Sequence, residues 1–168
     1  MKSSSPPSST GIRLLAIHPY GDGQGYSGPG VYLRRLLSYA EKRGIDVNLF
    51  HGRRATGSDD PLYRSISLLN LRSFGLLNQA RWFSASFLYV LILGGRYDCI
   101  HIHSAYLFNL GAAIAARLRG IPYVLLPVSQ GGDLTGRSTS SQALKTLRSW
   151  ATGDARFGFA LSPGIASE

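Results

Sequence analysis

The fold is decided by residues 12–50, which read IRLLAIHPYGDGQGYSGPGVYLRRLLSYAEKRGIDVNLF. The apolar run Ile12–Ile17 is typical of a strand buried in a parallel sheet. After a glycine-rich loop, apolar residues from Gly30 to Arg43 recur at spacings that place them on one face of a helix. Asp46–Phe50 predicts a second strand. This order is the opening unit of an α/β domain that handles nucleotides or sugars.

The rest of the chain continues the alternation. Helices are predicted at 74–93, 107–119 and 141–151, and strands at 99–103, 122–128 and 157–161. Residues 51–63 are polar and rich in turn formers, which predicts a loop. Such alternation produces right-handed crossovers and a mostly parallel sheet. We therefore expect a Rossmann-like, three-layer α/β domain over residues 11–168, preceded by a disordered Ser/Pro-rich tail, residues 1–10.

The composition is that of a globular protein, with 44% apolar and 16% charged residues. The single cysteine, Cys99, excludes an internal disulfide or a cysteine-based zinc cluster, and we expect it to be a small core residue. The net charge of +9 favours anionic partners such as phosphate, nucleotides or an acidic membrane surface. Nucleic acid is not expected, because the sequence lacks long basic runs and interleaved aromatic residues.

The stretch Trp82–Leu93, WFSASFLYVLIL, is the membrane candidate in the sequence. It covers about a dozen residues, whereas a spanning helix needs roughly 20. We therefore expect a helix packed against the sheet. The flanking Arg81 and Arg96 leave open a second interpretation, in which this helix docks onto an anionic bilayer surface.

The glycine-rich loop contains a literal G-x-G-x-x-G at Gly23, Gly25 and Gly28. It does not predict NAD binding, because the motif should follow its strand directly. In addition, Phe50 and His51 stand where an acidic residue would hold the ribose. An anion-binding interpretation remains, in which backbone N–H groups approach a phosphate at a helix N-terminus. The alternative is a surface loop without a ligand.

Two histidines, His101 and His103, share one face of a predicted strand because they are two residues apart. No third ligand stands at a suitable spacing, so no metal site is predicted. We expect His101 to be a satisfied core imidazole. His103 ends the strand, where ligands bind in such sheets. Asp133, after the next strand, either accepts hydrogen bonds from sugar hydroxyls or caps its turn.

The segments IRLLAIHPY, SGPGVYLRRLLSYAEKRGIDVNLF, YDCIHIHSAY, AAIAARLRGIPYVLLPV and GGDL follow one another in this order. Together they resemble the N-terminal half of family 4 glycosyltransferases. The resemblance covers residues 11–168 and implies one half of a GT-B architecture, whose two Rossmann-like domains face each other across the active-site cleft. It implies an acceptor-side domain of a hexosyltransferase that uses a nucleotide-sugar donor, no cofactor, and a glycan or lipid-linked acceptor.

The resemblance also implies roles for particular residues. The family's glycine loop, which approaches the donor diphosphate and the acceptor, corresponds to Ser27, Gly28, Pro29 and Gly30. His103 resembles the family's histidine that lies against the transferred sugar, and is the implied catalytic residue. The acceptor-side loop corresponds to Gln130, Gly131, Gly132 and Asp133. Family members often have histidine where Gln130 stands, so a second imidazole contact is not implied.

The family's second domain holds the nucleotide-sugar through a basic residue and a pair of glutamates, and these have no counterpart in the chain. We therefore expect a truncated product, a fragment or one half of a split enzyme. It would be inactive without a C-terminal donor-binding domain or partner chain. We expect a cytoplasmic protein, or one peripheral at the inner face of the membrane. The alternative function is a non-catalytic nucleotide- or phosphate-binding α/β module.

Overall fold

The computed structural model describes residues 11–19, 28–52, 64–66, 75–104, 106–126, 142–153 and 157–158. Within these residues, six strands form one sheet with the order β3-β2-β1-β4-β5-β6, and each pair of neighbours is parallel. The strands are β1 Arg13–His18, β2 Asp46–His51, β3 Arg64–Ile66, β4 Cys99–His103, β5 Tyr123–Leu126 and β6 Phe157–Gly158. This is the strand order of doubly wound dinucleotide-binding folds, so the predicted Rossmann-like α/β fold is confirmed.

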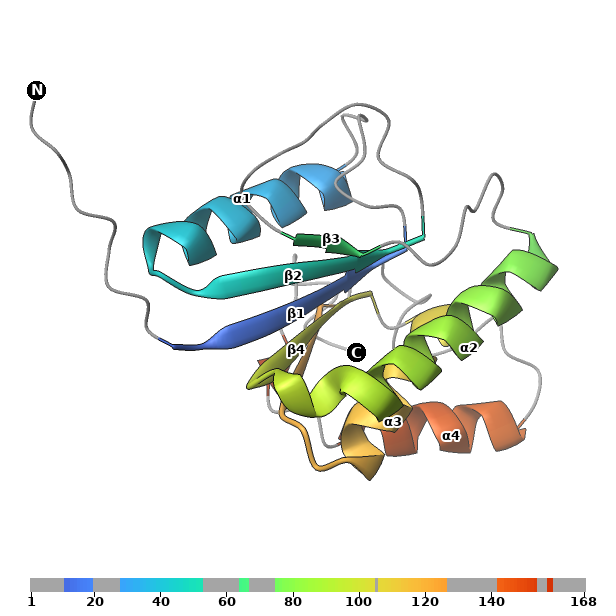
Figure 1. Ribbon diagram of the computed structural model, residues 1–168. Coiled ribbons are helices and arrows are strands. Elements are labelled where there is room, and N and C mark those ends of the chain that lie inside the picture. The colour runs from blue at the N-terminus through green and yellow to red at the C-terminus, as the bar shows by residue number, and fades with distance from the viewer. Residues whose placement is uncertain are drawn as a thin grey trace, which may run out of the picture.

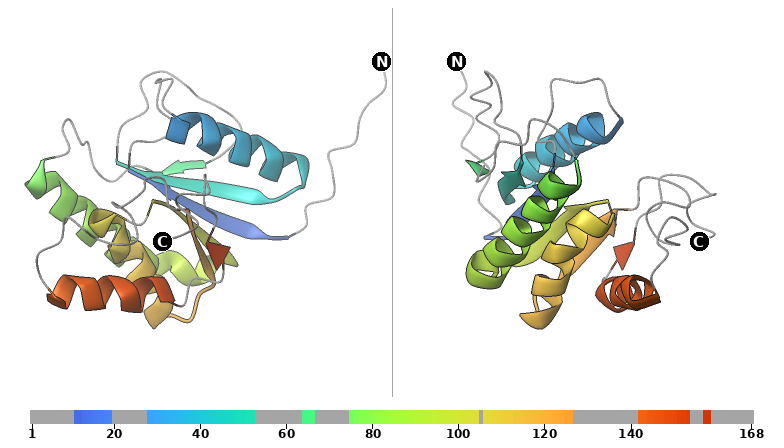
Figure 2. Two further views of the ribbon diagram at one scale, coloured as in Figure 1. Left: turned by 180° about the vertical axis from the view of Figure 1, so that it is seen from behind. Right: turned by 90° about the vertical axis from the view of Figure 1, so that its right-hand side faces the viewer.

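Helices cover both faces of the sheet (Figures 1 and 2). The α-helices are α1 Gly28–Lys42, α2 Leu76–Leu93, α3 Leu110–Leu118 and α4 Gln142–Gly153. Short 3-10 turns, η1 Gly94–Arg96 and η2 Leu107–Asn109, extend α2 and precede α3. Helix α1 lies on one face, and α2, α3 and α4 lie on the other (Figure 1). The result is the expected three-layer arrangement.

Two apolar clusters fill the spaces between these layers. Because side chains alternate along a strand, Leu15 and Ile17 of β1 join the larger cluster beneath α2 and α3, whereas Ala16 faces α1. In α1, Leu33, Leu37 and Ala40 are buried and form its apolar stripe. The helix is followed by Gly44, whose positive φ of 68° suits glycine as a C-terminal cap.

Helices α2 and α3 approach each other closely through small residues. Ala112, Ala113, Ala115 and Ala116 of α3 are fully buried. A Cβ atom added at Gly111 would lie 2.3 Å from the carbonyl oxygen of Phe83 in α2. The backbones therefore meet where α3 begins, and a side chain at this position would separate them.

Most predicted elements lie close to their observed bounds, and the differences have physical causes. Strand β3 was not predicted, because its three residues, Arg64–Ile66, are too few to show a period. The expected tail, residues 1–10, lies outside the described residues. Helix α2 begins at Leu76 and is therefore longer than the apolar stretch Trp82–Leu93.

By length and composition, the helix Leu76–Arg96 could cross a membrane. Core helices of globular proteins can have the same length and composition, and one side of α2 is in the core. Trp82, Tyr89 and Val90 are buried in the larger apolar cluster. The prediction that this helix packs against the sheet is therefore confirmed.

Candidate functional site

Three histidines form a row at the carboxyl edge of the sheet. His18 ends β1, His51 ends β2 and His103 ends β4. His18 is the register partner of His51, and the preceding residue Ile17 is the partner of Ile102. The rings of His18 and His103 have centroids 4.5 Å apart. Parallel pairing thus brings together side chains from distant parts of the chain.

Tyr32 of α1 lies against this row. Its ring centroid is 5.9 Å from that of His103 and 6.1 Å from that of His101, which lies one pleat back on the same face of β4. Tyr32 is in the second turn of α1, so the helix begins at the same edge of the sheet at which β4 ends. Gly28, Pro29 and Gly30, which form the first turn, therefore lie at the same end of the sheet as His103.

His101 and His103 are buried, with 6% and 3% of their surfaces exposed. Within the part of the chain that the structure describes, none of their four ring nitrogens has a hydrogen-bond partner. The expectation of a core position for His101 is confirmed, but no hydrogen-bond partner for its ring is found among the described residues. Buried polar groups are usually hydrogen-bonded, so two orphaned imidazoles indicate a place where a ligand could supply the partners.

Both imidazoles are neutral at pH 7. Burial lowers the pKa of His101 to about 4. Burial, followed by repulsion from His18 and His101, lowers the pKa of His103 to about 3. A neutral imidazole carries one N–H donor and one acceptor nitrogen. His103 is therefore suited to exchanging hydrogen bonds with hydroxyl groups and unsuited to donating a full proton at neutral pH.

Asn109 fixes the backbone at the carboxyl end of β4. Its amide nitrogen donates to the carbonyl oxygen of His103 at 2.7 Å, and to the Oγ and carbonyl oxygen of Ser104 at 2.6 and 3.3 Å. Its Oδ1 accepts a hydrogen bond from Trp82 Nε1 at 2.7 Å. Ser104 has a φ of 78°, which is strained for a residue other than glycine. The buried amide thus holds the backbone of His103 and the bend after it.

Several predicted site residues cannot be placed in this arrangement. Ser27, Gln130, Gly131, Gly132 and Asp133 lie outside the described residues. Among the residues that are described, no group of histidine, cysteine, aspartate or glutamate side chains could hold a metal ion. Cys99 is partly exposed rather than a full core residue, and burial raises the pKa of its thiol, which disfavours the reactive thiolate.

Sequence reasoning missed the remaining members of the site, which are His18, His51, Tyr32 and Asn109. A signal for the first two was available, because each histidine directly follows an apolar strand run. Carboxyl ends of parallel strands share one edge, so histidines in equivalent positions were bound to be neighbours. Tyr32 and Asn109 carried no such signal, since their partners come from other elements.

The comparisons with known proteins agree with this architecture. The model of the glycosyl transferase 4-like domain family matches residues 27–168. No curated protein matches the sequence at a significant level. A putative UDP-N-acetylglucosamine 2-epimerase from Listeria monocytogenes has 13% sequence identity and a TM-score of 0.56, over 93% of this chain and 40% of that chain.

Two further solved structures show the same fold at similarly low identity. MurG from Acinetobacter baumannii has 14% identity and a TM-score of 0.55, over 92% of this chain and 42% of that one. UDP-GlcNAc 2-epimerase from Neisseria meningitidis, bound to UDP-GlcNAc, has 12% identity and a TM-score of 0.56, over 93% of this chain and 43% of that one. The chain thus spans less than half the length of these proteins.

The family model covers most of the chain, and the structural neighbours share its doubly wound sheet. The predicted family and the GT-B type of fold are therefore confirmed. The chain belongs to the glycosyl transferase 4-like domain family.

Proposed function

We propose that the chain is the acceptor-side domain of a glycosyltransferase that transfers a sugar from a nucleotide-sugar to a glycan or lipid-linked acceptor. One observation carries the proposal: His103 is buried, neutral and without a partner among the described residues, at the edge where α1 begins. Ligands of doubly wound sheets bind at this edge. The Neisseria relative in the comparison is bound to UDP-GlcNAc, which supports a nucleotide-sugar as the ligand class.

In this proposal His103 donates its N–H to a hydroxyl of the transferred sugar, or accepts a hydrogen bond from it. Since its pKa is lowered to about 3, it orients the sugar and does not act as a general acid at neutral pH. Asn109 acts as a positioning residue, because it binds the carbonyl oxygen of His103 and the residue that follows. A fixed hydrogen-bonding group of this kind accelerates reactions by holding reactants in a productive geometry.

The glycine loop supplies the second part of the proposed site. The first N–H groups of a helix have no partner within the helix, and its N-terminus carries partial positive charge. Helix α1 has no acidic residue in its first turn that would oppose an anion. We propose that backbone N–H groups around Ser27–Gly30 stabilise the negative charge that develops on the leaving diphosphate. Preorganised N–H dipoles stabilise developing charge in this way in other enzymes. Gln130–Asp133 would meet the acceptor.

We further propose that the chain alone has no transferase activity and needs a donor-binding domain, from a C-terminal extension or a partner chain. Support comes from the comparisons, since the chain covers about 40% of the Listeria protein and similar shares of the others. The assay measures release of UDP or GDP from a panel of nucleotide-sugars. No release is expected from the chain alone, and turnover by the 168-residue chain would contradict this part of the proposal.

The role of His103 is tested directly by NMR of the histidine ring nitrogens. Methyl glycosides and UDP- and GDP-sugars are titrated into the chain, and the His103 signals are expected to shift while remaining those of a neutral ring. His103→Ala and His103→Gln should weaken the binding of these sugars, which is followed in the variants through the signals of the remaining histidines. Cys99→Ala is the matched control, since Cys99 lies on the same face at the other end of β4.

The same titration distinguishes the proposed function from the alternative one. A non-catalytic nucleotide-binding module would bind UDP or GDP tightly without a sugar, and His103→Ala would leave that affinity unchanged. His103 signals that no sugar shifts would refute its assignment to the sugar.

A further inference from the structure

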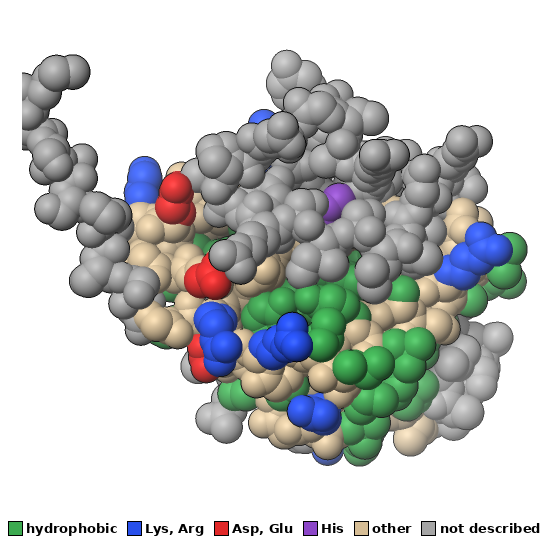
Figure 3. Space-filling model, in the orientation of Figure 1, with side chains coloured by type: hydrophobic (Ala, Val, Ile, Leu, Met, Phe, Trp, Pro, Cys, Tyr) green, Lys and Arg blue, Asp and Glu red, His purple; other side chains and the backbone are tan. Residues whose placement is uncertain are grey.

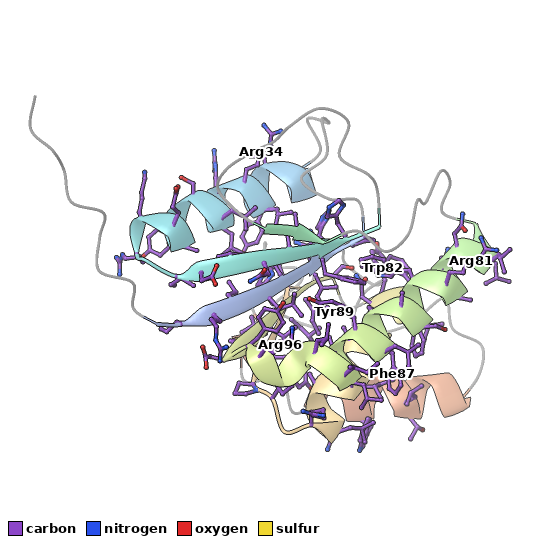
Figure 4. The ribbon with its side chains drawn as sticks, in the orientation of Figure 1. Arg34, Arg81, Trp82, Phe87, Tyr89 and Arg96 are labelled. Carbon is purple, nitrogen blue, oxygen red and sulfur yellow. The ribbon has the colours of Figure 1, made fainter. Side chains whose placement is uncertain are left out.

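The outer side of α2 carries an exposed apolar stripe. Leu77, Leu88 and Ile92 are 65%, 51% and 68% exposed. Their spacing places them on one side of the helix, over a length of about 22 Å at the usual rise per residue. Trp82 and Tyr89 lie on the other side, between α2 and the sheet (Figure 4). The helix is thus apolar on the side that faces away from the core as well.

Cations border this stripe, and the helices around it have no acidic residues. Arg81 lies in the stripe near one end of α2, and Arg96 lies at the other end (Figure 4). Arg119 donates to the carbonyl oxygen of Leu91 and adds a third guanidinium nearby. The sequences of α2, α3, α4 and both 3-10 turns contain no Asp or Glu. Figure 3 views this side and shows acidic side chains only toward its left-hand part.

We propose that this surface, defined by Leu77, Leu88, Ile92, Arg81, Arg96 and Arg119, rests on an anionic lipid bilayer. We call it the α2 face. A stripe of leucine and isoleucine can enter the boundary between headgroups and acyl chains, while flanking arginines bind lipid phosphates. The inference does not depend on the proposed function, because the α2 face is on the opposite side of the sheet from α1, Tyr32 and the histidine row.

The packing of α2 decides between lying on the membrane and crossing it. A crossing helix would have to leave the larger apolar cluster, and Trp82, Tyr89 and Val90 would lose their buried contacts there. The hydrogen bond from Trp82 to Asn109 would also break. A helix that keeps these contacts can lie only in the plane of the interface.

Charge complementarity selects a lipid surface over a second copy of the chain. A two-fold pairing of α2 faces would juxtapose the arginines of both copies, with no acidic side chain on these helices to neutralise them. An anionic bilayer provides the opposite charge. Each arginine near such a surface increases the binding constant by a factor of about five.

The experiment is co-sedimentation of the full chain with vesicles of phosphatidylcholine, with or without phosphatidylglycerol. Binding is expected to the anionic vesicles, and high salt should release the protein. The double variant Arg81→Gln/Arg96→Gln should bind roughly twenty-five-fold more weakly, as two factors of about five predict. Leu88→Gln/Ile92→Gln should also weaken binding, because it removes the inserted stripe.

Matched controls are available on α1, the helix on the other side of the sheet. Arg34→Gln/Arg35→Gln removes the same charge from exposed positions, and Arg34 points away from the sheet (Figure 4). Val31→Gln/Tyr39→Gln removes side chains that are 41% and 56% exposed. Both should bind anionic vesicles like the unmodified chain. Far-UV circular dichroism confirms that every variant is folded.

Five outcomes would overturn the inference. The first is that the unmodified chain does not bind anionic vesicles, and the second is that it binds neutral vesicles equally well. The third is an equal loss of binding in the α1 and α2 variants. The fourth is retention after high salt and alkaline washing, which would mean that the helix crosses the bilayer. The fifth is an oligomer in analytical ultracentrifugation that becomes monomeric in the Leu88→Gln/Ile92→Gln variant, which would assign the α2 face to a second copy of the chain.

Discussion

Substituting Gly111 by alanine tests the closeness of α2 and α3. The added Cβ would lie 2.3 Å from the carbonyl oxygen of Phe83, 3.1 Å from its carbonyl carbon and 3.2 Å from Ser86 Oγ. The nearest atoms belong to helix backbone, which cannot turn aside as a flexible side chain can. The two helices must therefore move apart, and the alanines beside Gly111 lose part of their contact with α2.

The magnitude follows from two opposing effects. Overpacking of a close core contact costs about 3 kcal/mol at the upper end of its usual range, which suits a clash with backbone. Alanine is favoured over glycine inside a helix by about 1 kcal/mol. We therefore expect Gly111→Ala to lower the free energy of unfolding by about 2 kcal/mol.

Urea unfolding followed by circular dichroism measures this change as a shift of the midpoint at constant slope. Gly153→Ala is the matched control, because Gly153 is in α4 and a Cβ atom there would meet nothing within 4 Å. It should leave stability unchanged or raise it by up to about 1 kcal/mol. If Gly111→Ala is as stable as Gly153→Ala, the close approach of α2 and α3 is refuted.

Further predictions concern buried polar groups. Asn109→Ala leaves Trp82 Nε1 and the carbonyl oxygen of His103 without their partner, and should lower the free energy of unfolding by about 3 kcal/mol in urea; a loss below about 1 kcal/mol would show that the network is not formed. Tyr123→Phe removes the hydrogen bond from its hydroxyl to the carbonyl oxygen of Ala151 at 2.5 Å, and should cost about 1 kcal/mol in the same measurement, whereas no change would mean that α4 is not anchored there. The free energy of unfolding should fall as the pH drops from about 6.5 toward 4. Histidines of the unfolded chain bind protons in this range, whereas buried His101 and His103 stay neutral because their pKa values are lowered to about 4 and about 3. Below pH 6.5, each of these two histidines lowers the free energy of unfolding by about 1.4 kcal/mol per pH unit. Equal unfolding free energies at pH 7 and 5 would contradict their burial as neutral rings. The double variant His101→Leu/His103→Leu should make the unfolding free energy less dependent on pH.

Local signals in the sequence explain which parts of the fold were predictable. Apolar runs such as Ile12–Ile17 and a helix stripe closed by Gly44 can be recognised without tertiary context. Strand β3 has three residues and no period, so only pairing with β2 defines it. The observed span of α2, Leu76–Leu93, lies close to the predicted 74–93, and Gly94 and Gly95 mark its end in the sequence.

The site was predictable only where a single residue carried the signal. His103 stands at the end of a strand, and its position alone pointed to the ligand-binding edge. His18 and His51 are more than thirty residues apart in the sequence, and only the parallel register makes them neighbours. Asn109 links a tryptophan from α2 to the backbone after β4, a relation that exists only once α2 and β4 pack together.

The two outermost strands have a consequence for the behaviour of the chain at high concentration. Within the described residues, β3 contains three residues and β6 two, so these parts of the sheet's rims offer few backbone groups to recruit a strand from a neighbouring molecule. Very short rims are among the devices by which natural sheet proteins resist edge-to-edge aggregation. The described edges of the sheet therefore discourage amyloid-like growth even though the central strands are strongly apolar.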